Sequence, residues 1–181
     1  MEDTHSFLNF IKKERIYYCM KSEEYEMNKN DFLRLLKKVL EKYNFKKRGS
    51  DFYLIGPKDL LVIIHLQKSA YGNMYYLNVC FSLIEYDESN KVNIPNWRDT
   101  DTYNRVKNIS ESNYCFDYDN IVVSDDFVVS NLEESIDAAM MEWIIPTLDN
   151  GSDYVIENVD FFSDLSNRFK IKREEFLNGK S

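Results

Sequence analysis

The chain has 181 residues, a length that fits one domain or one domain with an arm. Hydrophobic residues make up 44% of it, which excludes an intrinsically disordered chain. The net charge of −8 argues against nucleic acid and anionic membrane surfaces as partners.

The expected compartment follows from features that the sequence lacks. The N-terminal stretch contains no apolar core of signal-peptide length, and no run approaches the ~20 apolar residues that a membrane helix needs. The three cysteines, Cys19, Cys80 and Cys115, form no Cys-x-x-Cys pair, which disfavours a disulfide scaffold and a structural zinc site. We therefore expect a cytoplasmic protein with reduced thiols.

The first part of the chain predicts an arm followed by a helix. Residues 1–28 form a loosely amphipathic helical arm, and residues 29–181 are expected to be a single domain. Asn28 or Asn30 is a suitable N-cap for a helix that should stop near Asn44. The apolar residues of this helix recur at spacings of three and four: Phe32, Leu35, Leu36, Val39, Leu40 and Tyr43.

Three strands are predicted next. The first covers residues 45–55 and is broken by a turn at Arg48-Gly49-Ser50. Residues 60–67 are apolar on both faces until His65, which is typical of a strand in the centre of a sheet. Residues 74–86 form the third strand, and the Gly72-Asn73 loop indicates that it runs antiparallel to the second.

The remaining chain is predicted to be loop-rich over 87–110, extended over 120–130, and then helical. A capping box of Ser130 and Glu133 should begin a helix that ends near Pro146. Its apolar stripe consists of Leu132, Ile136, Ala139, Met140, Trp143 and Ile144. A last helix is expected to run through Phe162, Leu165, Phe169 and Phe176. Because the strands cluster rather than alternate with helices, we expect an α+β fold with an antiparallel sheet of about four to six strands and helices packed against it.

Charge is distributed unevenly along the chain. The 60 residues from 108 to 167 contain no Lys or Arg and fourteen Asp or Glu, so this segment carries −14 and the rest carries −8 + 14 = +6. The acids alternate with apolar residues, which predicts a folded segment with an acidic outer surface. Such a surface attracts basic partners, although it could also serve solubility alone. The candidate partner-binding residues are Asp117, Asp119, Asp125, Asp126, Glu133 and Glu134.

Motifs that carry chemistry are sparse. No phosphate-binding loop is present, and His5 and His65 lie sixty residues apart, which disfavours a catalytic metal. The pairs Asp99/Asp101 and Asp117/Asp119 are interpreted as acidic loops rather than metal ligands. We therefore expect no catalytic residues, no metal and no cofactor.

One family resemblance emerges from the residues already discussed. A Phe-Lys-Lys stretch with a following Gly and Phe, a strand that ends in Gln-Lys-Ser, and an Asn in the next strand resemble the bacterial family named domain of unknown function 4304, over about residues 29–110. The matching positions are Phe45, Lys46, Lys47, Gly49, Phe52, Gln67, Lys68, Ser69 and Asn78. One departure is that Arg48 separates Gly49 from the lysines. The resemblance implies an α+β fold and a bacterial cytoplasmic origin, and it implies no reaction.

Three functional hypotheses follow. The first, which we favour, is a non-catalytic immunity protein that neutralises a basic, nuclease-type toxin domain through the acidic surface. The second is a small enzyme or ligand-binding protein that uses His65, Gln67, Lys68 and Ser69, with Asn78 facing them. There His65 would be either a general base or a buried, hydrogen-bonded histidine. The third is a scaffold or dimerising module, with residues 7–18 as its apolar surface.

Overall fold

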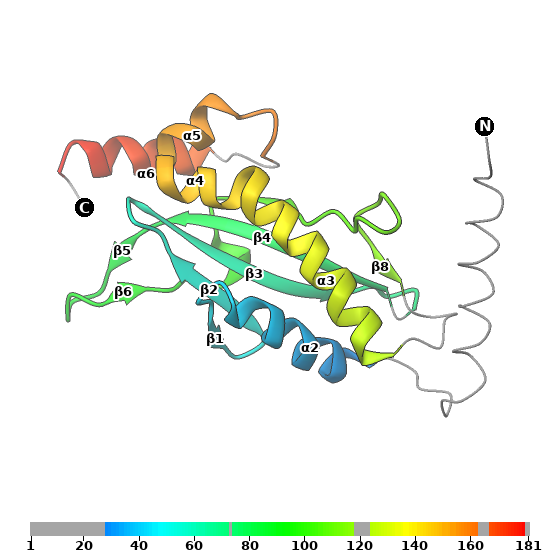
Figure 1. The fold of residues 1–181 in the computed structure, drawn as a ribbon. Helices are drawn as coiled ribbons and strands as arrows, with labels where there is room; N and C mark the ends of the chain where they lie inside the picture. The colour runs from blue at the N-terminus through cyan, green and yellow to red at the C-terminus, as the bar shows by residue number, and fades with distance from the viewer. Residues whose placement is uncertain (1–27, 73, 118–123, 163–166, 180–181) are drawn as a thin grey trace, which may run out of the picture.

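The computed structural model describes residues 28–72, 74–117, 124–162 and 167–179 (Figure 1). The arm expected over residues 1–28 lies, except for Asn28, outside the described residues. The fold is α+β, as expected: a six-stranded antiparallel sheet carries helices on one face. No helix in the described part of the chain combines the length and apolarity that a membrane span requires.

The first described helix, α2, spans Lys29–Glu41. Asn28 is its N-cap, and the Asn28 side chain accepts hydrogen bonds from the backbone N–H groups of Asn30 and Asp31. The helix ends shortly before Asn44, whose positive φ of 61° turns the chain into the sheet. The expected apolar stripe is confirmed, because five of its residues are fully buried: Phe32, Leu35, Leu36, Val39 and Leu40.

The sheet has the order β1-β2-β3-β4-β7, and β8 also pairs with β4. Its strands are β1 (Lys46–Arg48), β2 (Asp51–Ile55), β3 (Leu60–Lys68), β4 (Met74–Leu83), β7 (Thr102–Arg105) and β8 (Phe116–Asp117). Every pairing is antiparallel, and β3 and β4 lie in the centre. The expected turn between β1 and β2 is confirmed, and Gly49 there has a φ of 61°, a conformation that favours glycine.

The region expected to be loop-rich, 87–110, contains three short elements, β6 (Val92–Asn93), η1 (Trp97–Asp99) and β7, and β5 (Glu85–Tyr86) lies just before it. Strands β5 and β6 form a small hairpin, and η1 is a short 3-10 helix. The four residues of β7 are too few to show an alternating pattern.

The strand expected over residues 120–130 is wrong from residue 125 onward, and residues 120–123 lie outside the described residues. Helix α3 spans Asp125–Ala139 instead. Three of its apolar residues recur every fourth position and are fully buried: Val128, Leu132 and Ile136. The helical stripe therefore prevails over the local β propensity of the Val-Val pair.

The predicted capping box is also wrong. The N-cap of α3 is Ser124, whose Oγ accepts a hydrogen bond from the Phe127 backbone N–H at 3.2 Å. Ser130 lies two turns further on, exposed on the outer side of the helix. Its partner in the predicted box, Glu133, pairs with a lysine of α2.

The C-terminal part continues α3 through several short helices. A π-helical turn, η2 (Met140–Ile144), leads without a break into α4 (Ile145–Asn150). Pro146 lies in the first turn of α4, so the helix expected to end near Pro146 continues to Asn150. Helix α5 (Ser152–Glu157) follows Gly151, and α6 spans Asn167–Leu177. A Cβ atom at Gly151 would lie 2.4 Å from the carboxylate of Asp59, which hydrogen-bonds Ser152, so only glycine fits this junction.

The two faces of the sheet bury different sets of side chains. Helices α2 and α3 lie side by side over one face and cover the main core (Figure 1). The alternate residues of β3 and β4 point to the opposite face, where a smaller core contains Leu61, Ile63, Cys80 and Ile84. The β6–η1 segment packs on this second core through Val92, Ile94 and Trp97 and leaves part of the face open.

The new position of the α3 N-terminus can be tested with two serine substitutions. Ser124→Ala removes the N-cap and should lower the free energy of unfolding by about 0.5–2 kcal/mol. Ser130→Ala is the matched control, because it lies in mid-helix, where Ala is the better helix former; it should change stability by less than about 0.5 kcal/mol. Urea unfolding measures both, and a larger loss for Ser130→Ala would contradict the assignment of α3.

Candidate functional site

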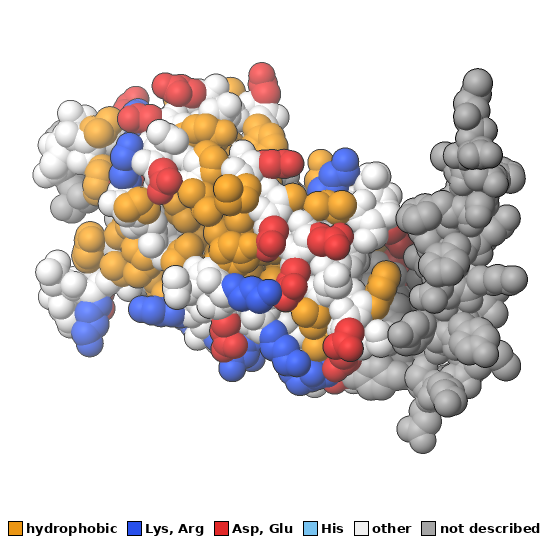
Figure 2. Space-filling model, viewed as in Figure 1, with side chains coloured by type: hydrophobic (Ala, Val, Ile, Leu, Met, Phe, Trp, Pro, Cys, Tyr) orange, Lys and Arg blue, Asp and Glu red, His pale blue; other side chains and the backbone are white. Residues whose placement is uncertain are grey.

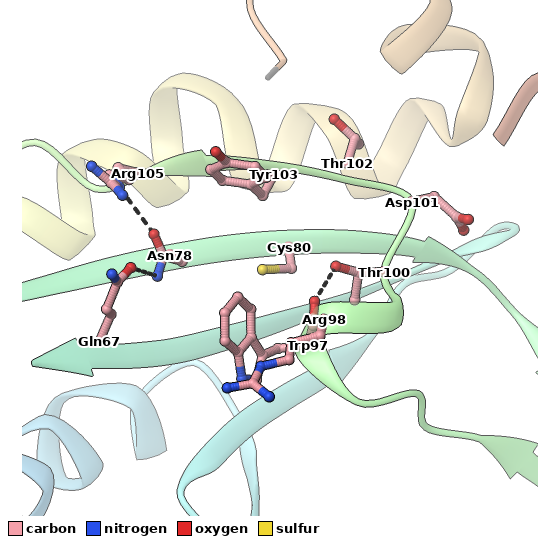
Figure 3. A pocket seen from close by; sticks show the side chains of 10 residues that line it. All are labelled: Gln67, Asn78, Cys80, Trp97, Arg98, Thr100, Asp101, Thr102, Tyr103 and Arg105. Carbon is pink, nitrogen blue, oxygen red and sulfur yellow. Dashed lines mark hydrogen bonds between the residues drawn. The ribbon is translucent and has the colours of Figure 1, made fainter. Parts of the chain in front are cut away.

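A pocket opens on the sheet face opposite α2 and α3 (Figure 3). Its volume is about 440 Å³. The floor is formed by β3 and β4, and the walls by η1 and β7. The lining includes Gln67, Asn78, Cys80, Trp97, Tyr103 and Arg105.

A chain of polar side chains crosses one end of the pocket (Figure 3). Asn78 Nδ2 donates to Gln67 Oε1 at 3.0 Å, and Arg105 Nε donates to Asn78 Oδ1 at 3.0 Å. Asn78 is only 3% exposed, so its amide depends on these two partners. The guanidinium group of Arg105 also lies over the ring of Tyr76, with 4.8 Å from Cζ to the ring centroid. Arg105 is therefore held in one orientation from two sides.

His65 lies directly across from Asn78 on β3, yet it is not part of the pocket lining. Its Nδ1 is 2.7 Å from Asp51 Oδ1. The imidazole ring stacks under Trp97, with 4.2 Å between the ring centroids. His65 thus holds η1 against the sheet and is a half-buried, hydrogen-bonded histidine.

The η1 segment and the turn after it form the opposite wall. Asn96 caps η1 by accepting a hydrogen bond from the Arg98 backbone N–H at 3.2 Å, and the Arg98 guanidinium lies 5.3 Å from the centroid of the Trp97 ring. Asp101 is 2% exposed and accepts hydrogen bonds from Ser82 Oγ and the Leu83 backbone N–H. The Asp101 carboxylate is therefore an anchor between the wall and β4, and Lys172 lies 3.4 Å from it.

The predicted Gln-Lys-Ser site is divided by the structure. Gln67 and Asn78 line the pocket. Lys68 is exposed at the end of β3, and the alternation of side chains along the strand directs it to the face that α2 and α3 cover. Ser69 closes the β3–β4 turn: its N–H donates to Met74 O at 2.8 Å, and its Oγ accepts from the Tyr71 N–H at 3.1 Å. The remaining resemblance positions, Phe45, Gly49 and Phe52, contribute buried rings and a turn.

Four of the six predicted acidic residues lie on α3, on the face of the sheet opposite the pocket. Asp125 pairs with Arg34 of α2 at 2.8 Å, and Glu133 pairs with Lys42. Asp126 and Glu134 are exposed on α3, and neither forms an ion pair within the described residues. Figure 2 shows acidic side chains along the α3 side of this face and Lys and Arg along the α2 side.

Two other predicted acids complete the set. Asp117 lies in β8, opposite Met74, and is half-buried. Asp119 lies outside the described residues.

On α3, Asp137 accepts a hydrogen bond from the hydroxyl of Tyr43. Burial, together with this bond to Asp137, raises the pKa of Tyr43 to about 12.

Sequence reasoning missed the residues that make the pocket polar. Arg105 lies in a strand of four residues, and Trp97 and Arg98 lie in a segment expected to be loop. The available signal was Asn78, a polar residue in an otherwise apolar strand, because a buried amide there requires partners. Sequence alone does not say which distant side chain provides them.

The closed floor of the pocket can be tested through Cys80. Burial raises the pKa of its thiol to about 12, with a hydrogen bond from Thr100 acting in the opposite direction. In a Cys19→Ser/Cys115→Ser variant, Cys80 should react with a disulfide reagent at about pH 8 at least about a hundredfold more slowly in the native state than in urea. Comparable rates in the two states would show that the floor is open.

Comparison with known proteins assigns the chain to a family. Residues 36–150, well over half of the chain, match the model of the family described as "Domain of unknown function (DUF4304)". The match begins later than the expected residue 29 and extends beyond residue 110 to include α3 and α4. No curated protein and no solved structure matches the chain. The protein, with its sheet, its pocket and its acidic helix, belongs to the DUF4304 family.

Proposed function

We propose that the protein is a non-catalytic immunity protein of the bacterial cytoplasm, which neutralises a basic, nuclease-type toxin domain through the acidic surface of α3. The observation that carries the proposal is the outer side of this helix. Asp126, Glu134 and Asp137 are exposed there. No Lys or Arg occurs between residues 108 and 167 to neutralise them from the same segment.

The contact between α2 and α3 supports a preformed binding surface. Arg34 holds Asp125 and Lys42 holds Glu133, so two of the six predicted acids are occupied within the chain. These exposed pairs each contribute about 0–1 kcal/mol, so their effect is to fix the orientation of α3 rather than to stabilise the fold. Of the other four, Asp126 and Glu134 are exposed on α3, whereas Asp117 is half-buried in β8 and Asp119 lies outside the described residues.

A basic partner suits this surface for two reasons. A nuclease binds nucleic-acid phosphates with Lys and Arg, and a stripe of carboxylates offers those side chains an alternative set of anions. The long-range field of the acidic segment also raises the rate of encounter with a positively charged partner. The partner is therefore expected to be a protein, and its association rate should fall as salt increases.

The proposal predicts that a gene adjacent to this one encodes the toxin domain, and the test co-expresses that gene product with the chain in a sensitive host. The wild-type chain should restore growth, and Asp126→Lys/Glu134→Lys should slow association with the purified toxin domain by at least about tenfold at low salt. Glu88→Lys/Glu175→Lys is the matched control: it makes the same charge change at two exposed acids away from α3 and should keep most of the association rate.

Two results would contradict the proposal. One is equal association rates for the α3 variant and its control, because the surface of α3 would then have no special role. The other is the failure of the wild-type chain to suppress the toxicity of the neighbouring gene product.

A further inference from the structure

We propose that the pocket on the sheet face opposite α2 and α3 binds a small organic anion, a carboxylate or a phosphate monoester. In this site Arg105 would receive the charged group, and Trp97 and Tyr103 would contact the body of the ligand. The proposal does not depend on the acidic surface of α3, because the two lie on opposite sides of the sheet.

The first argument is the fixed orientation of Arg105. Its Nε is occupied by Asn78 Oδ1, and its guanidinium plane lies over Tyr76. A guanidinium group has five N–H donors, so the two terminal nitrogens remain as a fork that matches the two oxygens of a carboxylate or phosphate. Within the described residues, no acid forms an ion pair with Arg105. The fork is held in place before any ligand arrives, which lowers the entropy cost of binding.

The second argument is the chain of buried amides behind Arg105. Asn78 is 3% exposed, and its two hydrogen bonds go to Gln67 and Arg105. Burying an amide in a sheet is unfavourable unless each polar atom is satisfied, and a network of this kind fixes geometry more than it adds stability. The geometry fixed here is that of a cation at the pocket wall.

The third argument is the charge balance of the pocket. Arg98 supplies a second cation at the rim, where it too forms no ion pair within the described part of the chain. Asp101 is the acid of the lining, and it already accepts hydrogen bonds from Ser82 and Leu83 and shares Lys172 with Glu85. Two Arg thus lie around one hollow of a chain with 31 Asp and Glu, and within the described residues neither forms an ion pair with a carboxylate. An anion from solution would complete this arrangement.

The size and the walls of the pocket define the rest of the ligand. A volume of about 440 Å³ falls within the range of about 300–1,000 Å³ that small-molecule sites occupy. Cys80 forms the floor and is 1% exposed, and Trp97 and Tyr103 border the space above it (Figure 3). These surfaces suit a compact apolar or aromatic body rather than an inorganic ion alone.

The probes are phenyl phosphate and benzoate, with benzamide as the uncharged analogue, each titrated calorimetrically into the full chain. At least one anion should bind with a Kd below about 1 mM, and benzamide should bind at least about tenfold more weakly. Tighter binding of phenyl phosphate or of benzoate decides between a phosphate and a carboxylate ligand. No binding of either anion up to about 10 mM would overturn the proposal.

Variants locate the site. Arg105→Gln should weaken the preferred anion at least about tenfold, and Arg105→Lys should weaken it by less, because it keeps the charge but loses the fork. Lys38→Gln is the matched control, since it removes one exposed charge on α2, on the other side of the sheet. Equal affinities for Arg105→Gln and Lys38→Gln would overturn the proposal.

Two further measurements serve as controls for the binding experiment. Circular dichroism tests whether Arg105→Gln is folded. If Arg105→Gln is unfolded, Arg98→Gln replaces it, because this variant leaves the hydrogen bonds of Gln67, Asn78 and Arg105 intact. Arg98→Gln should weaken anion binding at least about threefold. An unchanged affinity of Arg98→Gln would then count against the site. Asp126→Lys/Glu134→Lys should bind the anion like wild type, so failure of the acidic-surface proposal and failure of this one are distinguishable.

Discussion

The register between β3 and β4 is the constraint on which the rest of the structure depends. Nine residue pairs, from Leu60↔Leu83 to Lys68↔Tyr75, fix which side chains point to each face. One set packs under α2 and α3, and the other contains Gln67, Asn78 and Cys80 of the pocket. A slip of one residue would exchange the two sets, placing the amides in the core and the apolar side chains in the pocket. Fold and candidate site are therefore specified by the same pairing.

The contact between α2 and α3 turns the helical face into a surface with two signs of charge. Apolar residues bury the inner sides of both helices, which provides most of the stability because each fully buried large aliphatic side chain contributes about 1.5–3 kcal/mol. The polar outer sides then determine how the surface meets a partner. Arg34 of α2 and Lys42, just beyond its end, pair with acids of α3, whereas Asp126 and Glu134 are exposed on α3 and form no ion pair within the described residues.

Sequence patterns predicted the parts of the fold that depend on local periodicity. The α2 stripe and the central position of β3 follow from spacing and turn residues alone, and the structure selects Asn28 from the two predicted N-caps, Asn28 and Asn30. The incorrect strand prediction at residues 125–130 has a local cause, because the Val128-Val129 pair has high β propensity. In the folded chain a helix forms instead, since it buries every fourth residue from Val128 onward. The pocket could not be predicted, because it requires Arg105 to meet Asn78 across a strand pair whose register no local pattern defines.

The two proposed surfaces can coexist because ions in the solvent screen the electric field of the α3 acids at the position of the pocket. The outer side of α3 carries exposed acids, and the chain's net charge of −8 would by itself repel an anion from the pocket. Arg98 and Arg105 of the pocket form no ion pair within the described residues. A sheet with packed helices places the two surfaces at least about 10 Å apart, whereas the Debye length at physiological ionic strength is about 8 Å. The field of the α3 acids, which by our proposal would steer a basic partner, is thus largely screened at the pocket. There, direct hydrogen bonds from Arg105 at contact distance determine whether an anion binds. Affinity at the pocket should therefore depend on salt much less than the rate of association at α3 does.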